Sequence, residues 1–198
     1  MEEQIHLAKD NEESLAKELQ SKSNEIIYEK TETEEETINE DETSQLEYIF
    51  KIISENLLNI TSSNKQIKIS PNISPIFNIN KPLISIYDYL CRINRYSSFE
   101  LSTYIVSLIY LDRICKEAKI FLTPYNIHKL LFTSILIAAK YNEDKLYTNS
   151  HYAKIAGVST KELINMENCF LFAIKFKLYI DVKTYQEYSS CLNYNNDD

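Results

Sequence analysis

The chain has 198 residues but only one glycine, Gly157. Phosphate-binding loops, nucleophile elbows and dinucleotide-binding fingerprints each require at least two glycines, so the sequence excludes these sites. Tight β-hairpins also favour glycine at turn positions with positive φ. The sequence therefore predicts an all-α protein, and it excludes the enzyme classes that bind nucleotides or activate a serine with glycine-rich loops.

Acidic residues are concentrated towards the N-terminus. Residues 1–43 carry a net charge of −11 and residues 44–198 carry +3, which gives −8 for the whole chain. The run TETEEETINEDET at residues 31–43 has almost no apolar side chains to bury, so we predict a flexible acidic tail over residues 1–43. The remaining sequence predicts one domain over residues 44–192 and a disordered end at residues 193–198.

Charge and hydrophobicity also limit the partners and the compartment. The sequence lacks the strong positive charge typical of nucleic-acid binders. Its longest apolar run, residues 130–139, is about half a membrane span, and its first residues lack the pattern of a signal peptide. The four cysteines are widely spaced, as expected for reduced thiols. We expect a protein of the cytoplasm, the nucleus or both, without a membrane or direct nucleic-acid partner.

Helix-type apolar spacing and helix start signals predict seven helices after residue 43. Including their capping residues, they cover about residues 44–59, 85–96, 97–118, 123–142, 149–156, 159–175 and 181–192. The start signals include two capping boxes, at residues 97–100 and 159–162, and a Thr-Pro pair at 123–124. The helices over 97–118 and 123–142 are apolar nearly all round, so each must be surrounded by other helices. We expect a five-helix bundle over about residues 83–180, with an additional helix before it and a short one after it.

The sequence offers no catalytic or metal-binding constellation. His6, His128 and His151 are scattered, and none has the spacing of a zinc site. Glu143 and Asp144 form an acidic pair at a helix end rather than a spaced acid and base. We therefore expect no enzyme activity, cofactor or metal.

One segment imitates a DNA-reading helix-turn-helix. Ala153, Gly157 and Leu163 have the appropriate spacing, but the second helix carries Glu162 and Glu167, which are unfavourable opposite phosphate groups. DNA binding is therefore only the third functional alternative for this chain.

Three motifs occur in order along the chain, namely YLDR at residues 110–113, AAKYNED at 138–144 and ME at 166–167. Together they resemble the cyclin box, the five-helix module that binds and activates cyclin-dependent kinases. Residues 85–93, 130–131 and 149–159 are similar to the P-type group, also called U-type or phosphate-regulatory cyclins, in which a single box is the pattern. The resemblance covers about residues 44–192 and is strongest over 83–190.

The resemblance implies a kinase-binding surface. In the family, residues matching Lys140 and Glu167 hydrogen-bond the kinase backbone near its αC helix, and neighbouring apolar positions receive that helix. The residues assigned to kinase binding in this way are Lys140, Glu167, Ile137, Tyr141, Leu171, Phe176 and Leu178. The alternative is an intramolecular Lys140–Glu167 bridge without a partner role.

Three further residues are expected to be structural. We expect Asp112 to be a buried, hydrogen-bonded group and Gly157 to end the helix over residues 149–156. The arginine that usually pairs with the family's aspartate belongs to a Met-Arg-x-Ile-Leu opening that is absent here, since residues 82–85 stand near its place. Arg92 is one candidate partner for Asp112. Without that opening, the sequence does not predict docking of Arg-x-Leu substrates.

The resemblance therefore predicts a non-catalytic subunit that forms a heterodimer with a cyclin-dependent kinase and activates it by positioning the αC helix. The leading alternative is a cyclin-fold adaptor that binds a protein other than a kinase.

Deletion of residues 1–40 should leave the melting temperature nearly unchanged, because a segment of this composition contributes little packed apolar surface. Calorimetry of the full and shortened chains measures this directly. A large fall in melting temperature would show instead that the acidic segment packs on the domain.

Overall fold

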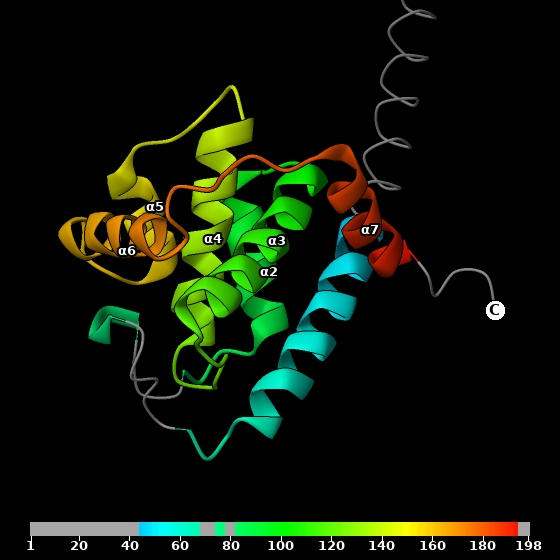
Figure 1. Cartoon of the computed structure of the whole chain (residues 1–198). Helices are drawn as coiled ribbons and strands as arrows, with labels where there is room; N and C mark the ends of the chain where they lie inside the picture. The colour runs from blue at the N-terminus through cyan, green and yellow to red at the C-terminus, as the bar shows by residue number, and fades with distance from the viewer. Residues whose placement is uncertain (1–43, 68–73, 78–81, 194–198) are drawn as a thin grey trace, which may run out of the picture. The chain divides into compact units, whose positions relative to one another are not determined.

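A computed structural model describes residues 44–67, 74–77 and 82–193 (Figure 1). The predicted acidic tail, residues 1–43, lies outside the described residues. So does the predicted disordered end, except for its first residue, which closes the last helix. Residues 47–193 belong to one compact unit.

The described residues contain helices and no β-strand, which confirms the all-α prediction. A helix over residues 44–63, here called the leading helix, comes first. The elements that follow are η1 (Pro75–Phe77), α2 (Ile86–Ser97), α3 (Leu101–Ala118), α4 (Ile127–Asn142), α5 (Asn149–Ala156), α6 (Thr160–Ala173) and α7 (Val182–Asn193). Helices α2–α6 form the expected five-helix bundle, with the leading helix before it and α7 after it.

Helix α4 is the centre of the core. Between Ile127 and Ala139 every side chain except Lys129 is buried. Its two buried hydroxyls are satisfied within the helix, because Thr133 donates to the carbonyl of Lys129 and Ser134 to that of Leu131. Helix α3 packs along α4 over the largest area, and α5 and α6 also contact α4. The predicted central pair of helices is therefore confirmed.

Both flanking helices are attached to α3. The leading helix buries Ile49, Phe50, Ile53 and Leu57, and the ring of Phe50 meets that of Tyr104 edge-on at 4.8 Å. At the other end of the chain, α7 packs against α3. Aromatic pairs of this geometry add about 0.5–1.5 kcal/mol to the effect of buried area.

Several helix starts follow the sequence signals. The Oγ of Ser85 accepts from the N–H of Asp88 at the start of α2, and the Oγ of Ser159 accepts from the N–H of Glu162 at the start of α6. Asp181 accepts from the N–H of Thr184 at 2.9 Å at the start of α7. Each cap satisfies an N–H that has no partner within its helix.

The capping box predicted at residues 97–100 is wrong. Ser98 instead ends α2 with a φ of 50°, and Glu100 precedes α3 without a side-chain cap of its own. The carboxylate of Glu143, which follows α4, caps α3 from a distance. Its Oε1 accepts from the N–H of Glu100 at 3.0 Å and from the hydroxyl of Thr103 at 2.6 Å.

The predicted start of α4 at the Thr-Pro pair is also three residues early. Residues 123–126 form a turn, in which Asn126 Oδ1 accepts from the N–H of Thr123 at 2.8 Å and Asn126 Nδ2 donates to the carbonyl of Phe121 at 2.9 Å. Because the asparagine closes this turn on itself, α4 begins only at Ile127.

Replacing Glu143 with alanine should lower the free energy of unfolding by about 1–2 kcal/mol, since α3 loses its N-terminal acceptor. Urea titration followed by circular dichroism measures the change. The matched control is Asp144→Ala, which removes the same charge from the neighbouring position. Equal losses for both variants would rule out a specific capping role for Glu143.

Candidate functional site

Lys140 and Glu167 join the end of α4 to the middle of α6. Lys140 Nζ lies 2.5 Å from Glu167 Oε1 and 2.8 Å from Asn149 Oδ1 at the start of α5. The side chain of Glu167 is only 10% exposed, and that of Lys140 is 32% exposed. An intramolecular Lys140–Glu167 bridge, which the sequence allowed as the alternative to a partner role, is therefore formed. The ammonium group still lies at the surface with a third N–H that has no acceptor among the described residues.

Three large aromatic side chains near the C-terminal ends of α4 and α6 are exposed to solvent. Tyr141 is 55% exposed, Phe172 70% and Phe176 56%. The rings of Phe172 and Phe176 form an edge-to-face pair with centroids 5.2 Å apart. The sequence prediction included Tyr141 and Phe176 but missed Phe172. No local spacing signalled Phe172, because Phe176 lies beyond the end of α6 and the two rings meet only through the turn that follows the helix.

The other predicted apolar positions differ in exposure. Leu171 and Leu178 are half-buried, whereas Ile137 is only 4% exposed and belongs to the core. Ile137 lies one turn before Tyr141 on α4, at a level where other helices still cover this face. It supports the surface from beneath rather than presenting a side chain to a partner.

A strained turn after α6 presents Phe176. Lys175 and Phe176 both have positive φ, of 57° and 55°, which is unusual for residues other than glycine. The N–H of Phe176 donates to the carbonyl of Leu171 at 2.9 Å, and the N–H of Lys177 donates to that of Ile174 at 3.1 Å. Such a turn persists only where surrounding contacts impose it.

Helix α3 supplies those contacts along the α6–α7 connection, residues 174–181 (Figure 1). The hydroxyl of Tyr110 donates to the carbonyl of Leu178 at 2.8 Å. The guanidinium of Arg113 donates to the carbonyl of Lys177 and, at 3.3 Å, to that of Tyr179. Two residues of the YLDR motif therefore fix the backbone of this connection.

Glu117 adds an electrostatic clamp one turn further along α3. Its two carboxylate oxygens lie 2.8 Å from Lys175 Nζ and 2.5 Å from Lys177 Nζ. Hydrogen bonds from Lys175 and Lys177 lower the pKa of Glu117 from its ordinary value of 4.5 to about 2. The Glu117 clamp thus binds the residues on both sides of Phe176 and stabilises the turn.

A shallow groove of about 380 Å³ begins beside Tyr141. Its walls come from α3, the end of α4, the α6–α7 connection and the start of α7. The lining residues are Ser102, Val106, Tyr110, Tyr141, Asn142, Leu178, Tyr179, Ile180, Val182 and Tyr185. The Lys140–Glu167 pair, the exposed aromatic rings and this groove contain most of the residues that the sequence predicts to bind a partner, so we refer to them together as the binding face.

Asp112 is hydrogen-bonded as expected, but it is not buried, and Arg92, one candidate for its partner, does not pair with it. The Asp112 side chain is 38% exposed, and its Oδ2 accepts from Lys116 Nζ at 2.5 Å and from the hydroxyl of Tyr188 at 2.9 Å. Arg92 lies on α2 and donates instead to the carbonyl of Lys154 on α5 at 3.2 Å. Asp112 therefore attaches α7 to α3, because its side chain is directed to α7 rather than to α2.

Gly157 ends α5 with a φ of 73°, which glycine adopts at little cost. His128 is buried on α4, with Nε2 3.1 Å from the carbonyl of Ile84, and burial lowers its pKa.

Among the described residues, no cluster of three histidine, cysteine, aspartate or glutamate side chains is arranged to hold a metal ion. No helix in the described ranges has the length and apolar character needed to cross a membrane.

Comparison with known proteins identifies the family. The family model described as Cyclin matches residues 5–178. The chain belongs to the cyclin family. The match begins before the first described residue and ends within the α6–α7 connection, so it covers the whole five-helix box.

Curated relatives of this cyclin include plant proteins of the U and P groups. The chain is 37% identical to Cyclin-U4-3 of Arabidopsis thaliana over 144 residues, which is 72% of this chain and 63% of the relative. It is 43% identical to Cyclin-U4-2 of the same plant over 115 residues, 58% of this chain and 53% of the relative. For Cyclin-P3-1 of Oryza sativa subsp. japonica the identity is 36% over 107 residues, 54% and 45% of the two chains. The matches thus span between 45% and 63% of these relatives, and they confirm the resemblance to P-type and U-type cyclins.

Replacing Glu117 with glutamine should loosen the turn around Phe176, because Lys175 and Lys177 lose their shared carboxylate. Hydrogen-exchange protection factors of the Phe176 and Lys177 amides, measured by NMR, should fall while those in α4 stay unchanged. The control is Glu187→Gln, which removes a carboxylate from the more distant exposed pair with Lys183 (3.9 Å).

The same turn should loosen in the unmodified protein at low pH. Since folding lowers the pKa of Glu117, its stabilising contribution is complete above pH 4.5 and is lost as the pH falls through about 2. Protection that is equal in Glu117→Gln and the unmodified protein at neutral pH would contradict the clamp.

Proposed function

We propose that this cyclin is a regulatory subunit that binds a cyclin-dependent protein kinase and activates it by positioning the kinase αC helix. The observations that carry the proposal are a preformed Lys140–Glu167 pair next to the exposed Tyr141 at the end of α4, and the exposed ring pair of Phe172 and Phe176 where α6 ends. A charged pair flanked by aromatic and aliphatic groups has the composition of an interface hot spot. Exposed apolar area of this kind is costly unless a partner covers it.

The geometry of the pair suits recognition of a helix backbone. Lys140 has a free N–H for a carbonyl, and Glu167 Oε2 has no partner among the described residues and can accept from a backbone N–H. Because Asn149 and Glu167 already hold the ammonium group, little side-chain freedom is lost when a partner binds. The exposed rings would then exclude water from these hydrogen bonds.

Activation would be allosteric, with all chemistry in the kinase. Kinase catalysis requires an ion pair between a lysine of strand β3 and a glutamate of the αC helix. A subunit that binds only the correctly placed αC helix shifts the kinase towards that state. Moving the balance from 1:99 to 99:1 requires about 5.5 kcal/mol of differential binding, which an interface of the standard size, about 1,600 Å², is able to supply.

We propose the cytoplasm, the nucleus or both as the place of action. All four cysteines are free in the structure, and three of them are at least partly shielded. Free, unpaired thiols are typical of reducing compartments.

The alternative is a cyclin-fold adaptor that binds a protein other than a kinase through another face of the same fold. A kinase-activation assay with the recovered partner separates the two functions. The helix-turn-helix alternative is disfavoured by the packing of α6. Its Leu163, Met166 and Phe170 are fully buried, and Glu162 is held by Lys129 at 2.7 Å. The polar face left for a DNA groove includes carboxylates, which repel phosphate.

Replacing Lys140 with alanine should weaken kinase binding by about 2–5 kcal/mol, as expected for a desolvated charge pair at an interface. The partner is first recovered by affinity purification of the full chain from its own cells and identified by mass spectrometry. Titration calorimetry with that kinase then gives the affinities. The matched control is Lys145→Ala, which removes an exposed lysine five residues further along the chain.

A charge-swapped variant separates binding from folding. Lys140→Glu combined with Glu167→Lys keeps the intramolecular attraction but reverses the charges offered to a partner. We expect the melting temperature to stay close to that of the unmodified chain while the kinase is lost. Retained kinase binding in this variant would mean that the pair is structural only, and recovery of other proteins without a kinase would favour the adaptor.

A further inference from the structure

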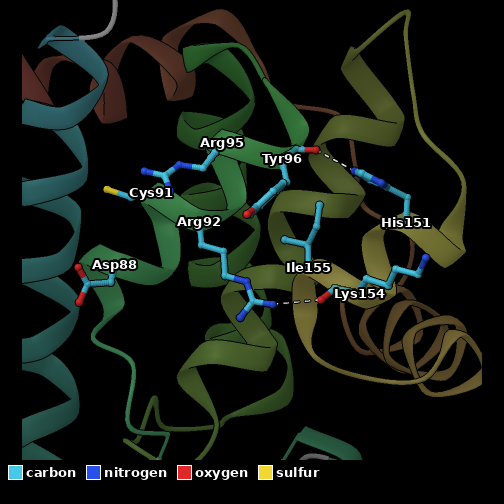
Figure 2. Close-up of a pocket in the computed structure, with 8 residues that line it drawn as sticks. All are labelled: Asp88, Cys91, Arg92, Arg95, Tyr96, His151, Lys154 and Ile155. Carbon is cyan, nitrogen blue, oxygen red and sulfur yellow. Dashed lines mark hydrogen bonds between the residues drawn. The ribbon is translucent and has the colours of Figure 1, made fainter.

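A second groove lies between α2 and α5, away from the binding face, and it has a different chemistry. It has a volume of about 640 Å³ and shares no lining residue with the binding face. Helix α2 contributes Cys91, Arg92, Arg95 and Tyr96, and α5 contributes the side chains around Lys154 (Figure 2). This volume falls within the range of about 300–1,000 Å³ that is usual for ligand-binding pockets.

Three cations and only one carboxylate line the α2–α5 groove. None of Arg92, Arg95 and Lys154 forms an ion pair with any described residue. Six other lysines of the described chain form ion pairs with carboxylates, namely Lys116, Lys129, Lys140, Lys175, Lys177 and Lys183. The lining of this groove therefore holds positive charge that no ion pair neutralises.

The arginines retain most of their hydrogen-bonding capacity. Arg92 uses Nη2 for the carbonyl of Lys154, and Arg95 has no acceptor among the described residues. The two lie three residues apart on α2, so their Cβ atoms are about 5–6 Å apart. Figure 2 shows the two guanidinium groups directed differently, that of Arg92 towards Lys154 and that of Arg95 away from it. They therefore suit two separate carboxylates of one segment, each of which arginine can bind through two parallel N–H donors.

The groove contains one carboxylate, and it is already engaged. Asp88 accepts from the hydroxyl of Ser85 at 2.7 Å in the first turn of α2. Figure 2 shows Asp88 at one end of the groove, with its carboxylate directed away from the guanidinium of Arg92. The net charge of the lining is therefore positive.

The groove also has an apolar wall, and part of it is rigid. The ring of Tyr96 is 53% exposed, and Ile155 is buried behind it. His151 is held by Nε2, which lies 2.8 Å from the carbonyl of Tyr96, and by its ring contact with Tyr147, with centroids 4.4 Å apart. A fixed wall of this kind can accept an apolar side chain at a small entropic cost.

We propose that the α2–α5 groove docks an acidic peptide segment of a protein partner. Carboxylates of that segment bind Arg92 and Arg95, and an apolar side chain between them covers Tyr96. Unpaired cations beside an exposed aromatic ring favour a peptide, which offers both kinds of side chain at short intervals. Nucleic acid is disfavoured, because residues 44–198 carry only +3 overall. The proposal does not depend on kinase binding, since the two surfaces are separate.

The test uses the full chain and a fluorescein-labelled ten-residue peptide of alternating glutamate and leucine. Fluorescence anisotropy should show saturable binding that weakens with added salt. The variant Arg92→Glu/Arg95→Glu should reduce the affinity by about tenfold or more, and Tyr96→Ala should reduce it by a smaller factor. The control Lys161→Glu/Lys183→Glu makes the same total charge change elsewhere and should bind normally.

Folding and alternative ligands are covered by parallel measurements. Circular dichroism and melting curves confirm that each variant is folded, and Arg92→Gln/Arg95→Gln repeats the test without introducing negative charge. Loss of binding with both arginine variants but not with the control supports the proposal. The proposal would be overturned if all variants bound the peptide equally or if the unmodified chain did not bind it. It would also be overturned if random-sequence duplex DNA bound more tightly than the peptide, or if only a phosphoserine peptide gave saturable binding.

Discussion

The burial of α4 on every side is the constraint on which the rest of the structure depends. A helix without a polar face must be enclosed, and α3, α5 and α6 provide that enclosure. The apolar run stops after Ala139, and the next three residues are exposed. Lys140 and Tyr141 therefore emerge where the enclosure ends, directly beside α6. The core thus determines where the Lys140–Glu167 pair reaches the surface.

Helix α3 connects this core to everything that follows α6. One side of the helix packs on α4, and its other side holds the α6–α7 connection through Tyr110, Arg113 and Glu117. Asp112, which lies between Tyr110 and Arg113 in the sequence, attaches α7 to α3 through a hydrogen bond from Tyr188. The four residues occupy just over two turns, so one rigid helix fixes both the exposed ring of Phe176 and the wall of the adjoining groove.

Local patterns in the sequence were sufficient for the fold class and for several helix starts. The lone glycine, the apolar spacing and the caps at Ser85, Ser159 and Asp181 all act within a few residues, and the structure agrees with them. The resemblance to the cyclin box singled out Lys140 and Glu167, and their side chains meet in the structure.

Long-range contacts were not predictable in the same way. A free N–H at a helix start accepts any nearby oxygen, so the capping of α3 by Glu143 cannot be read from residues 97–100. The burial of Ile137 depends on which helices cover that level of α4. Asp112 pairs with Tyr188, 76 residues away, because α7 folds back onto α3. Each of these outcomes depends on tertiary packing rather than on local spacing.

The positive φ at Lys175 and Phe176 places stability and recognition in competition. Each such residue costs about 1–2 kcal/mol relative to a relaxed backbone, and glycine or asparagine would tolerate the conformation better. Selection for heat resistance alone would therefore favour glycine at position 176 and erase the ring there. A laboratory-evolved, thermostable form of this cyclin would then keep every helix and still lose the exposed ring that we propose for kinase binding.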